Sequence, residues 1–418
     1  MTVTFIRSHP QLKSINRRHA KTTKTFLSKP NKTIFFEVKN CPSCRSRKLD
    51  RKAESSHIVV DLKFSRSGVN KYITQFISCR YNCKKCGKSF RSEDQSMNLH
   101  KCGHGLASWC VYQNNVLGVN MAKVRKSLVD LFGLHLNQST LDRTKNRIAT
   151  FYEPLREEIL NQILASPVLH IDETTVRLRK QRGYVWVLDT IDKVYYFYRP
   201  TRETEFLHEM LASFRGILVS DFYTGYDSLP CEQQKCIVHL VRDIDDDLLR
   251  NPFDEELKHL AQAFGILLRS IISTIDRFGL RRRHLNKHKK DVNRFLESEV
   301  VRDFSSENAN KYAKRFRKYG ARMFTFLDHD GVPWNNNNAE HAIKRFVKYR
   351  RDTDGRYSES TLKEYLILAT IFETCEFNSV NVLKFLLSKE RTLDGLLRMA
   401  GKRVRESKFP ESETVPIS

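Results

Sequence analysis

The sequence predicts an α/β protein, in which a mixed core of sheet and helices carries an all-α insertion and follows a zinc-binding β module and a helical segment. Three observations lead to this fold class. Between residues 167 and 222, β-branched and aromatic runs alternate with short turns and one amphipathic helix. Residues 240–330 show helical periodicity almost throughout. Two Cys-x2-Cys pairs mark a separate module closer to the N-terminus.

The elements of the core follow one another in order. After Pro167, VLHIDETTV, GYVWVLDTI and KVYYFYRP are strand-like runs joined by short turns. ETEFLHEMLASF has the spacing of an amphipathic helix, and GILVSDF is a further buried strand. KCIVHLV is either another strand or a strand–helix junction. A helix begins at Glu340, and ESTLKEYLILATIFETCEFN forms one more.

The charge of the chain predicts a polyanionic partner. The 418 residues carry a formal charge of +25, and 40% of them are hydrophobic, which is typical of a folded protein. The excess is uneven, because residues 1–50 hold twelve Lys and Arg against two acids and RRRHLNKHKK at 281–290 is almost wholly cationic. Nucleic acid bound in a salt-dependent manner is the natural candidate. A basic protein kept soluble by its charge is the alternative.

The N-terminal residues and the cysteines indicate the cellular compartment in which the protein is expected to be found. The first twenty residues contain no apolar core of a secretory signal, and the most apolar run, YLILATIF at 365–372, is too short to cross a membrane. The ten cysteines are therefore expected to be mostly reduced. We expect a soluble cytoplasmic protein associated with the nucleoid.

Close cysteine pairs in a reduced protein are typical of metal ligands. Cys41 and Cys44 form one Cys-x2-Cys pair, and Cys83 and Cys86 form another. We predict that the four hold one structural Zn²⁺ in a closed site that serves architecture and DNA contact. The gap between the pairs is long, so other residues compete for one corner or a second site. These spare candidates are Cys79, His100, Cys102 and His104, while Cys102 and Cys110 fit buried free thiols equally well.

The segment from 105 to 165 is helical by its periodicity, and Ser139 and Thr140 are candidate N-caps of its third helix. Three short helices with a basic third helix fit a helix-turn-helix. An ordinary helical linker bundle explains the same periodicity.

Three acidic residues in unlike settings predict a second kind of metal site. Asp172 and Asp221 each stand at the polar end of a strand-like run, and Glu340 opens a basic helix far downstream. Converging carboxylates without a Ser or Cys nucleophile signature suit hard divalent cations. Two Mg²⁺ or Mn²⁺ ions in such a site can hold the attacking and leaving oxygens of a phosphodiester in line.

Each acid also has a structural explanation. Asp172 caps a turn or pairs with a nearby cation, Asp221 is a turn aspartate, and Glu340 favours the helix dipole and pairs with Lys344. The nearby cations for Asp172 are Arg177, Arg179 and Lys180. Glu173, Asp189 and Asp227 are local competitors, interpreted as supporting or turn residues.

Five ordered blocks carry a resemblance to a known family. HIDETTVRL, GYVWVLDT, FRGILVSDFYTGYD, CIVHLVRD and NNNNAEHAIKRF resemble the DDE transposases with a ribonuclease-H-like core, most closely those of the insertion sequence 66 family. ILATIFETCEFNSVNVLKFL also resembles the C-terminal helices of that family. The resemblance covers roughly residues 167–390. The zinc module and helical segment are similar to the family only in plan.

The resemblance implies that Asp172, Asp221 and Glu340 are the metal-binding catalytic triad. Cys236 and His239 match a Cys-x2-His pattern found after the second aspartate in such enzymes, either as a structural core pair or as a DNA or metal contact. The block before Glu340 commonly begins with an acid in this family, whereas this chain has Asn335 at that position. Six cations are interpreted as DNA-binding, with a solvated basic face as the alternative for the first three: Lys344, Arg345, Lys348, Arg281, Arg282 and Arg283.

On this basis the chain divides into six parts. They are a basic flexible arm (1–34), a zinc-binding DNA-contact module (35–104), a helix-turn-helix-like segment (105–165), a ribonuclease-H-like catalytic core (166–239 and 331–390), a basic all-α insertion (240–330), and a C-terminal helix with a loose tail (391–418).

The resemblance implies a transposase of an insertion sequence that binds terminal repeats as a homo-oligomer on DNA. It would cleave a strand at the transposon end with Mg²⁺ and join the freed 3′-OH to target DNA. Two other functions fit the same residues. One is a non-catalytic DNA-binding regulator derived from a transposase, and the other is a structure-specific ribonuclease-H-like nuclease.

Overall fold

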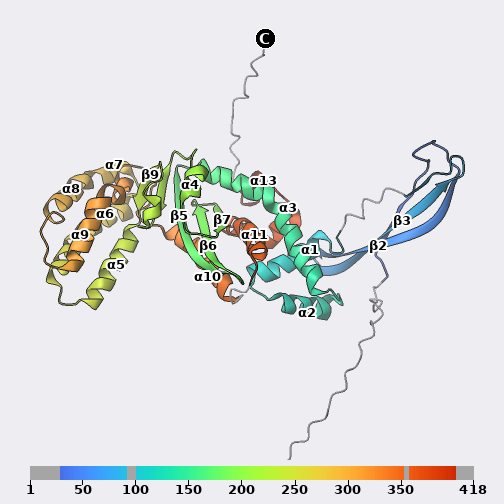
Figure 1. Cartoon of the computed structure of the whole chain (residues 1–418), viewed down its shortest axis with the longest axis horizontal. Helices are drawn as coiled ribbons and strands as arrows, with labels where there is room; N and C mark the ends of the chain where they lie inside the picture. The colour runs from blue at the N-terminus through green and yellow to red at the C-terminus, as the bar shows by residue number, and fades with distance from the viewer. Residues whose placement is uncertain (1–28, 92–99, 353–356, 402–418) are drawn as a thin grey trace, which may run out of the picture. The chain divides into compact units, whose positions relative to one another are not determined.

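A computed structural model describes residues 29–91, 100–352 and 357–401, which fall into two compact units (Figure 1). The first unit contains the described residues up to Gly103 together with Leu128–His135, and the second contains the rest. The predicted arm (1–34) and tail (391–418) lie mostly outside the described residues. Where they are described, the arm already includes the start of a strand and the tail includes a short helix.

The first unit is built on a long antiparallel ribbon. Its sheet has the order β1-β3-β2, with β4 also paired to β3 and β1 running parallel to β3. Alternate apolar residues such as Leu62 and Ile73 are buried, as expected for half-buried strands. The ribbon turns between Ser65 and Gly68, where a φ of 127° favours glycine. The strands are β1 (Lys32–Phe36), β2 (Leu49–Ser65), β3 (Gly68–Cys83) and β4 (Ser89–Arg91).

A helical segment follows. It consists of α1 (His104–Val111), the short η2 (Tyr112–Val116), α2 (Met121–Phe132) and α3 (Gln138–Leu164). The N-cap prediction for α3 is wrong by two or three residues. The cap is Asn137, whose side-chain oxygen accepts a hydrogen bond from the Thr140 N–H at 2.9 Å. Ser139 and Thr140 lie inside the helix, and their hydroxyls donate to the Asn137 side chain.

The second unit contains a five-stranded mixed sheet in the order β7-β6-β5-β8-β9. β5, β6 and β7 are antiparallel, and β8 and β9 run parallel to β5. The mixed α/β architecture expected from the sequence is therefore present. The elements are β5 (Val168–Arg177), β6 (Arg182–Asp189), β7 (Val194–Arg199), α4 (Glu205–Met210), β8 (Ile217–Ser220), η3 (Thr224–Tyr226) and β9 (Glu232–Lys235).

Helices cover both faces of this sheet, so its strands are hydrophobic almost throughout. The face that carries Ile171, Trp186 and Phe197 packs against α1, α3 and the last three described helices of the chain. The opposite face, which carries Val187 and Tyr196, packs against the two helices that begin at Asn337 and Glu359. In chain order, the described C-terminal helices are α10 (Asn337–Asp352), α11 (Glu359–Phe377), α12 (Val382–Ser388) and α13 (Leu393–Met399).

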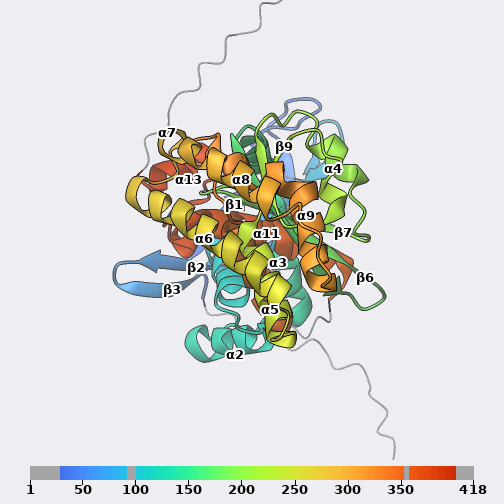
Figure 2. The same ribbon diagram turned by 90° about the vertical axis from the view of Figure 1, so that its left-hand side faces the viewer.

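Between β9 and α10 the chain forms a helical bundle with its own core, which lies nearest the viewer in Figure 2. KCIVHLV is a strand–helix junction, because β9 ends at Lys235 and α5 begins at Ile237. The side chains of Asp254 and Ser306 cap the two longest of the following helices. The bundle comprises α5 (Ile237–Arg250), α6 (Glu255–Phe278), α7 (Arg282–Leu285), η4 (Asn286–His288), α8 (Lys289–Ser298), α9 (Glu307–Met323) and η5 (Thr325–Leu327).

In the described part of the chain, no one helix has both the length and the apolar character needed to cross a bilayer. Helices α11 and α12 meet these criteria only when taken together, across a bend of 117°.

Replacing the N-cap of α3 tests the corrected helix start. We expect Asn137→Ala to lower the free energy of unfolding by about 1 kcal/mol, because the Thr140 N–H loses its acceptor. Ser139→Ala, the matched control, should change it by less than about 0.5 kcal/mol. Denaturant titration of the full chain measures both, and a larger loss for Ser139→Ala would contradict the assignment.

Candidate active site

The four predicted zinc ligands lie together at the end of the β2–β3 ribbon opposite its turn. Each Cys-x2-Cys pair closes a tight turn, in which the Arg45 N–H donates to the Cys41 carbonyl and the Gly87 N–H donates to the Cys83 carbonyl, both at 2.9 Å. The four sulfur atoms lie within 4.8 Å of one another. This arrangement fits a Zn²⁺ ion with four thiolate ligands. The cysteines are Cys41, Cys44, Cys83 and Cys86.

The spare candidates do not join them. Cys79 Sγ accepts a hydrogen bond from Arg51 Nε at 3.1 Å, and His104 Nε2 contacts the Leu386 carbonyl at 2.7 Å. Cys102 and Cys110 are buried. Among the described residues, no metal-sized group of possible ligands includes any of these four or His100.

Asp172 and Asp221 lie on neighbouring parallel strands. Asp172 is in the middle of the central strand β5, on the face that α10 covers, and Asp221 directly follows β8. The register pairs His170 with Val219, so two residues further it brings Asp172 level with Asp221. The Glu173 N–H donates to Asp172 at 2.8 Å, and the Tyr223 N–H donates to Asp221 at 2.9 Å. Backbone donors therefore orient both carboxylates.

Asn336, which the sequence analysis overlooked, holds the start of α10 against β5. Its side chain is completely buried and donates through Nδ2 to the Ile171 carbonyl at 2.9 Å. Its Oδ1 faces His170 Nδ1 at 2.9 Å. Burial lowers the pKa of His170 to about 4, so the neutral ring donates to this oxygen. The Asn336 N–H in turn donates to Cys236 Sγ at 3.2 Å. The side-chain amide of Asn336 thus joins α10 to β5, and its backbone N–H joins α10 to the start of α5.

Glu340 stands one turn into α10, and its side chain is 11% exposed. Arg242 Nη1 donates to both carboxylate oxygens at 3.2 Å, and Lys344 Nζ lies 3.7 Å away, as the i,i+4 spacing predicts. The ligand atoms of Cys236, His239 and Glu340 all lie within 4.8 Å of one another. Among the described residues, Asp172, Asp221 and Glu340 do not form a group this close.

The three carboxylates nevertheless interact electrostatically. Burial raises the pKa of Asp172 to about 7, and the negative charges of Glu173, Asp221 and Glu340 act in the same direction, while the Glu173 N–H opposes them. Asp172 has no ion pair among the described residues, which removes the proposed pairing with nearby cations as its explanation. The site therefore concentrates negative charge that no side-chain cation compensates at Asp172.

Two of the three competing acids, Glu173 and Asp227, have other partners among the described residues. Glu173 points to the opposite face of the sheet, where the Tyr226 hydroxyl and the Arg202 guanidinium donate to it. Asp227 pairs with Lys318 at 2.8 Å and with the buried Lys235 at 3.5 Å. Asp189 is fully buried, and burial raises its pKa well above the usual value. The supporting or turn role expected for these acids stays a prediction, and both Asp189 oxygens are buried without a hydrogen-bond partner among the described residues.

The predicted DNA-binding cations differ in their surroundings. Arg345 is engaged by Glu376 and Glu373 on α11, whereas the Lys344 side chain is largely exposed. The arginines at 281–283 line a hollow of about 580 Å³ with Asn286 and Asp330.

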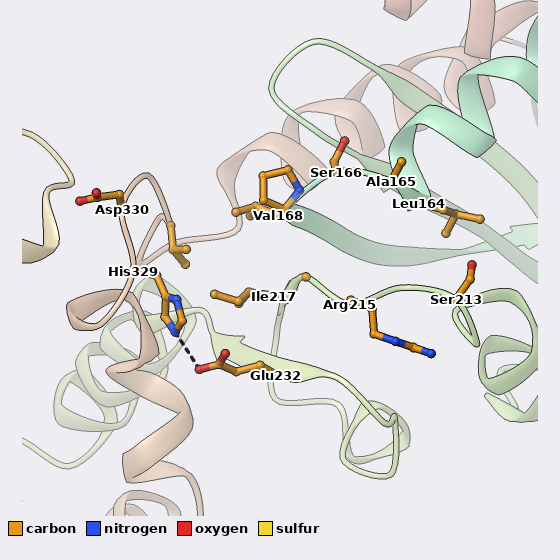
Figure 3. A pocket seen from close by; sticks show the side chains of 13 residues that line it. Leu164, Ala165, Ser166, Val168, Ser213, Arg215, Ile217, Glu232, His329 and Asp330 are labelled. Carbon is orange, nitrogen blue, oxygen red and sulfur yellow. Dashed lines mark hydrogen bonds and ion pairs between the residues drawn. The ribbon is translucent and has the colours of Figure 1, made fainter. Parts of the chain in front are cut away.

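A separate hollow of about 540 Å³ lies where β5 and β8 begin, at the opposite end of these strands from Asp221 (Figure 3). Val168 and Ile217, at the starts of β5 and β8, line it, and His329 Nε2 contacts Glu232 at 2.9 Å across it. It contains none of the predicted catalytic residues, so its chemistry is separate from that of Asp172 and Asp221.

Comparison with known protein families identifies the family to which this chain is related. The model of the transposase IS66 family matches residues 101–361. The chain belongs to this family. The matched range includes Asp172, Asp221, Cys236, His239 and Glu340, and it excludes the four cysteines predicted to bind zinc.

Two further similarities accompany the family match. An uncharacterized protein, y4hP of Sinorhizobium fredii, is 22% identical over 287 residues, which are 60% of this chain and 52% of that protein. The chain thus spans about half the length of this curated relative. The catalytic domain of the Mos1 mariner transposase is 13% identical, with 54% of this chain and 98% of that domain covered. Its TM-score of 0.14 is too low to support an argument.

Loss of one cysteine tests the zinc site. We expect Cys83→Ser to lose one equivalent of zinc per chain, because three thiolates hold the ion much more weakly than four. Cys231→Ser, at a half-buried thiol outside the group, should keep the full zinc content. Metal analysis of the purified proteins measures both, and unchanged zinc in Cys83→Ser would rule out the site.

Loss of the Asn336 amide tests the contact between α10 and β5. We expect Asn336→Ala to lower the free energy of unfolding by about 2–4 kcal/mol, because the Ile171 carbonyl and His170 Nδ1 lose their buried partner. The exposed Asn337 next to it supplies the control, and Asn337→Ala should cost less than about 1 kcal/mol. Similar unfolding midpoints for the two variants would disprove the role of the buried amide.

Proposed function

We propose that the protein is the DDE transposase of an insertion sequence, which binds terminal repeats, cleaves DNA strands and transfers the 3′-OH end to target DNA. The single observation that carries this proposal is the position of Asp172 on β5 and of Asp221 directly after the neighbouring parallel strand β8, with Glu340 on the helix that Asn336 ties to β5. Membership of the transposase family supports it.

The residues present fit divalent cations. Asp172, Asp221 and Glu340 offer carboxylate oxygens, the donors that Mg²⁺ and Mn²⁺ prefer. Burial raises the pKa of Asp172 and the neighbouring negative charges add to the shift, and a bound cation would relieve the repulsion among these charges. Two Mg²⁺ or Mn²⁺ ions bound there would supply activation of the attacking oxygen and stabilisation of the leaving 3′ oxygen.

The chain's own residues position these groups. The N–H groups of Glu173 and Tyr223 fix the rotation of the two aspartates, and Asn336 fixes the helix that carries Glu340. Arg242 balances the Glu340 charge from a side chain that is 54% exposed, so it is able to move when substrate or metal arrives. Preorganisation of this kind reduces the entropy lost on reaching the reactive geometry.

The basic surfaces would hold DNA phosphates. On α10, Lys344 and Lys348 follow Glu340 at intervals of one helical turn, so all three share one side of the helix. Arg345 contributes to DNA binding only if it leaves Glu376 and Glu373. The arginine-lined hollow at 281–283 and the zinc module would contact DNA further from the cleaved bond. Assembly as a homo-oligomer would bring two transposon ends together at the nucleoid.

Replacing Asp172 tests the proposal. We expect Asp172→Asn to reduce Mg²⁺-dependent nicking at the transposon end by at least about a hundredfold, because loss of a direct ligand exceeds the usual effect of an outer contact. DNA binding should remain, since the substitution removes negative charge. Glu209→Gln, on the exposed surface of α4, serves as the control and should cleave normally. Normal cleavage by a folded Asp172→Asn chain would reject the assignment.

Failure of the wild-type chain to cut, with intact binding, would favour a non-catalytic regulator. Cleavage without strand joining, and a preference for branched DNA, would favour a structure-specific nuclease. A gel assay with labelled ends resolves nicked and joined products in the same experiment.

A further inference from the structure

We propose that Cys236, His239 and Glu340 form a second metal site, suited to a thiophilic divalent cation such as Zn²⁺. The site goes beyond the proposed function, because a thiol and an imidazole are not the oxygen donors that Mg²⁺ prefers. It shares only Glu340 with the proposed catalytic carboxylates. Since a carboxylate has two oxygens, Glu340 is able to serve both sites.

The distances suit a small tetrahedral ion. The candidate ligand atoms of the three residues all lie within 4.8 Å of one another, and His239 Nδ1 is 3.8 Å from Glu340 Oε1. Ligands on a tetrahedral Zn²⁺ stand about 3.3–3.8 Å apart, given the usual bond lengths. Small side-chain rotations are therefore enough to close the site.

The local fold explains why these atoms meet. Cys236 caps the start of the fourteen-residue helix α5, and His239 stands in the first turn of that helix. Glu340 stands in the first turn of α10. The Ile237 N–H donates to the Trp334 carbonyl at 3.0 Å, so the two helix starts are tied together. A Cys-x2-His spacing thus presents both side chains to the same carboxylate.

The donor atoms are prepared for a ligand. Burial raises the pKa of the Cys236 thiol, while the Asn336 N–H that donates to Sγ acts in the opposite direction and orients the sulfur. His239 Nδ1 is shielded from solvent and has no hydrogen-bond partner in the described chain, since 3.8 Å to Glu340 is too long. A bound cation would satisfy this nitrogen, whose lack of a partner otherwise costs free energy.

Arg242 competes with the cation for Glu340. It now donates to both carboxylate oxygens at 3.2 Å, and its exposed side chain is free to swing into solvent. Metal binding and this ion pair are therefore alternatives. Three protein ligands leave one position for water or a phosphate oxygen. The bound cation would fasten α5, and with it the helical bundle, to the helix that carries Glu340.

Metal content of the full-length chain tests the site. With Zn²⁺ as the probe, we expect two equivalents in the wild type, one in Cys83→Ser and one in His239→Ala, with the Zn²⁺ dissociation constant of the second site raised at least about tenfold by His239→Ala. His239 is half-buried, so its variant should fold even if Cys236→Ser does not. His341→Ala, at an exposed histidine on α10, is the control and should keep two equivalents.

Cobalt substitution identifies the ligands. A chain carrying Cys41→Ser and Cys86→Ser should bind one Co²⁺ whose spectrum contains a sulfur-to-cobalt band, and Cys236→Ser should abolish that band. Asp172→Asn should leave the zinc content and the sulfur-to-cobalt band unchanged, because Asp172 is not a ligand of this site, so failure of the proposed catalytic site does not affect the result. Equal zinc content in the wild type and His239→Ala, together with a cobalt band that survives Cys236→Ser, would overturn the proposal.

Discussion

The arrangement of the candidate active site depends on one buried asparagine. Asn336 bonds to the Ile171 carbonyl, His170 and Cys236, and so ties the central strand to the starts of two helices. Each of these groups would cost about 1–3 kcal/mol if left without a partner in the interior. Because the contact is made one residue before Asp172 and four residues before Glu340, it sets the positions of both carboxylates.

Around this contact, the clustered carboxylates lower the stability of the fold. Burial raises the pKa of Asp172 to about 7, and the negative charges of Glu173, Asp221 and Glu340 act in the same direction. A stable core favours apolar groups at such positions. Asp172 in the middle of β5 therefore carries a cost in stability that an apolar side chain would avoid.

Much of this arrangement follows from local sequence. Apolar runs predict the strands that end at Asp221 or contain Asp172, and Cys-x2-Cys spacing predicts the sulfur cluster. The role of Asn336 does not follow, because in a run of four asparagines only the tertiary fold decides which one is buried. The cap of α3 was misplaced for a similar reason, since Asn137, Ser139 and Thr140 all have suitable side chains and only the backbone selects one.

The β2–β3 ribbon has a consequence for any DNA that the protein binds. β3 has 16 residues, and at about 3.4 Å per residue it extends for up to about 50 Å. One turn of the double helix advances by about 34–36 Å. The sulfur cluster and the hairpin turn, at opposite ends of the ribbon, are therefore unable to contact the same helical turn when the ribbon lies along the DNA. A single small module would then sample phosphates more than ten base pairs apart.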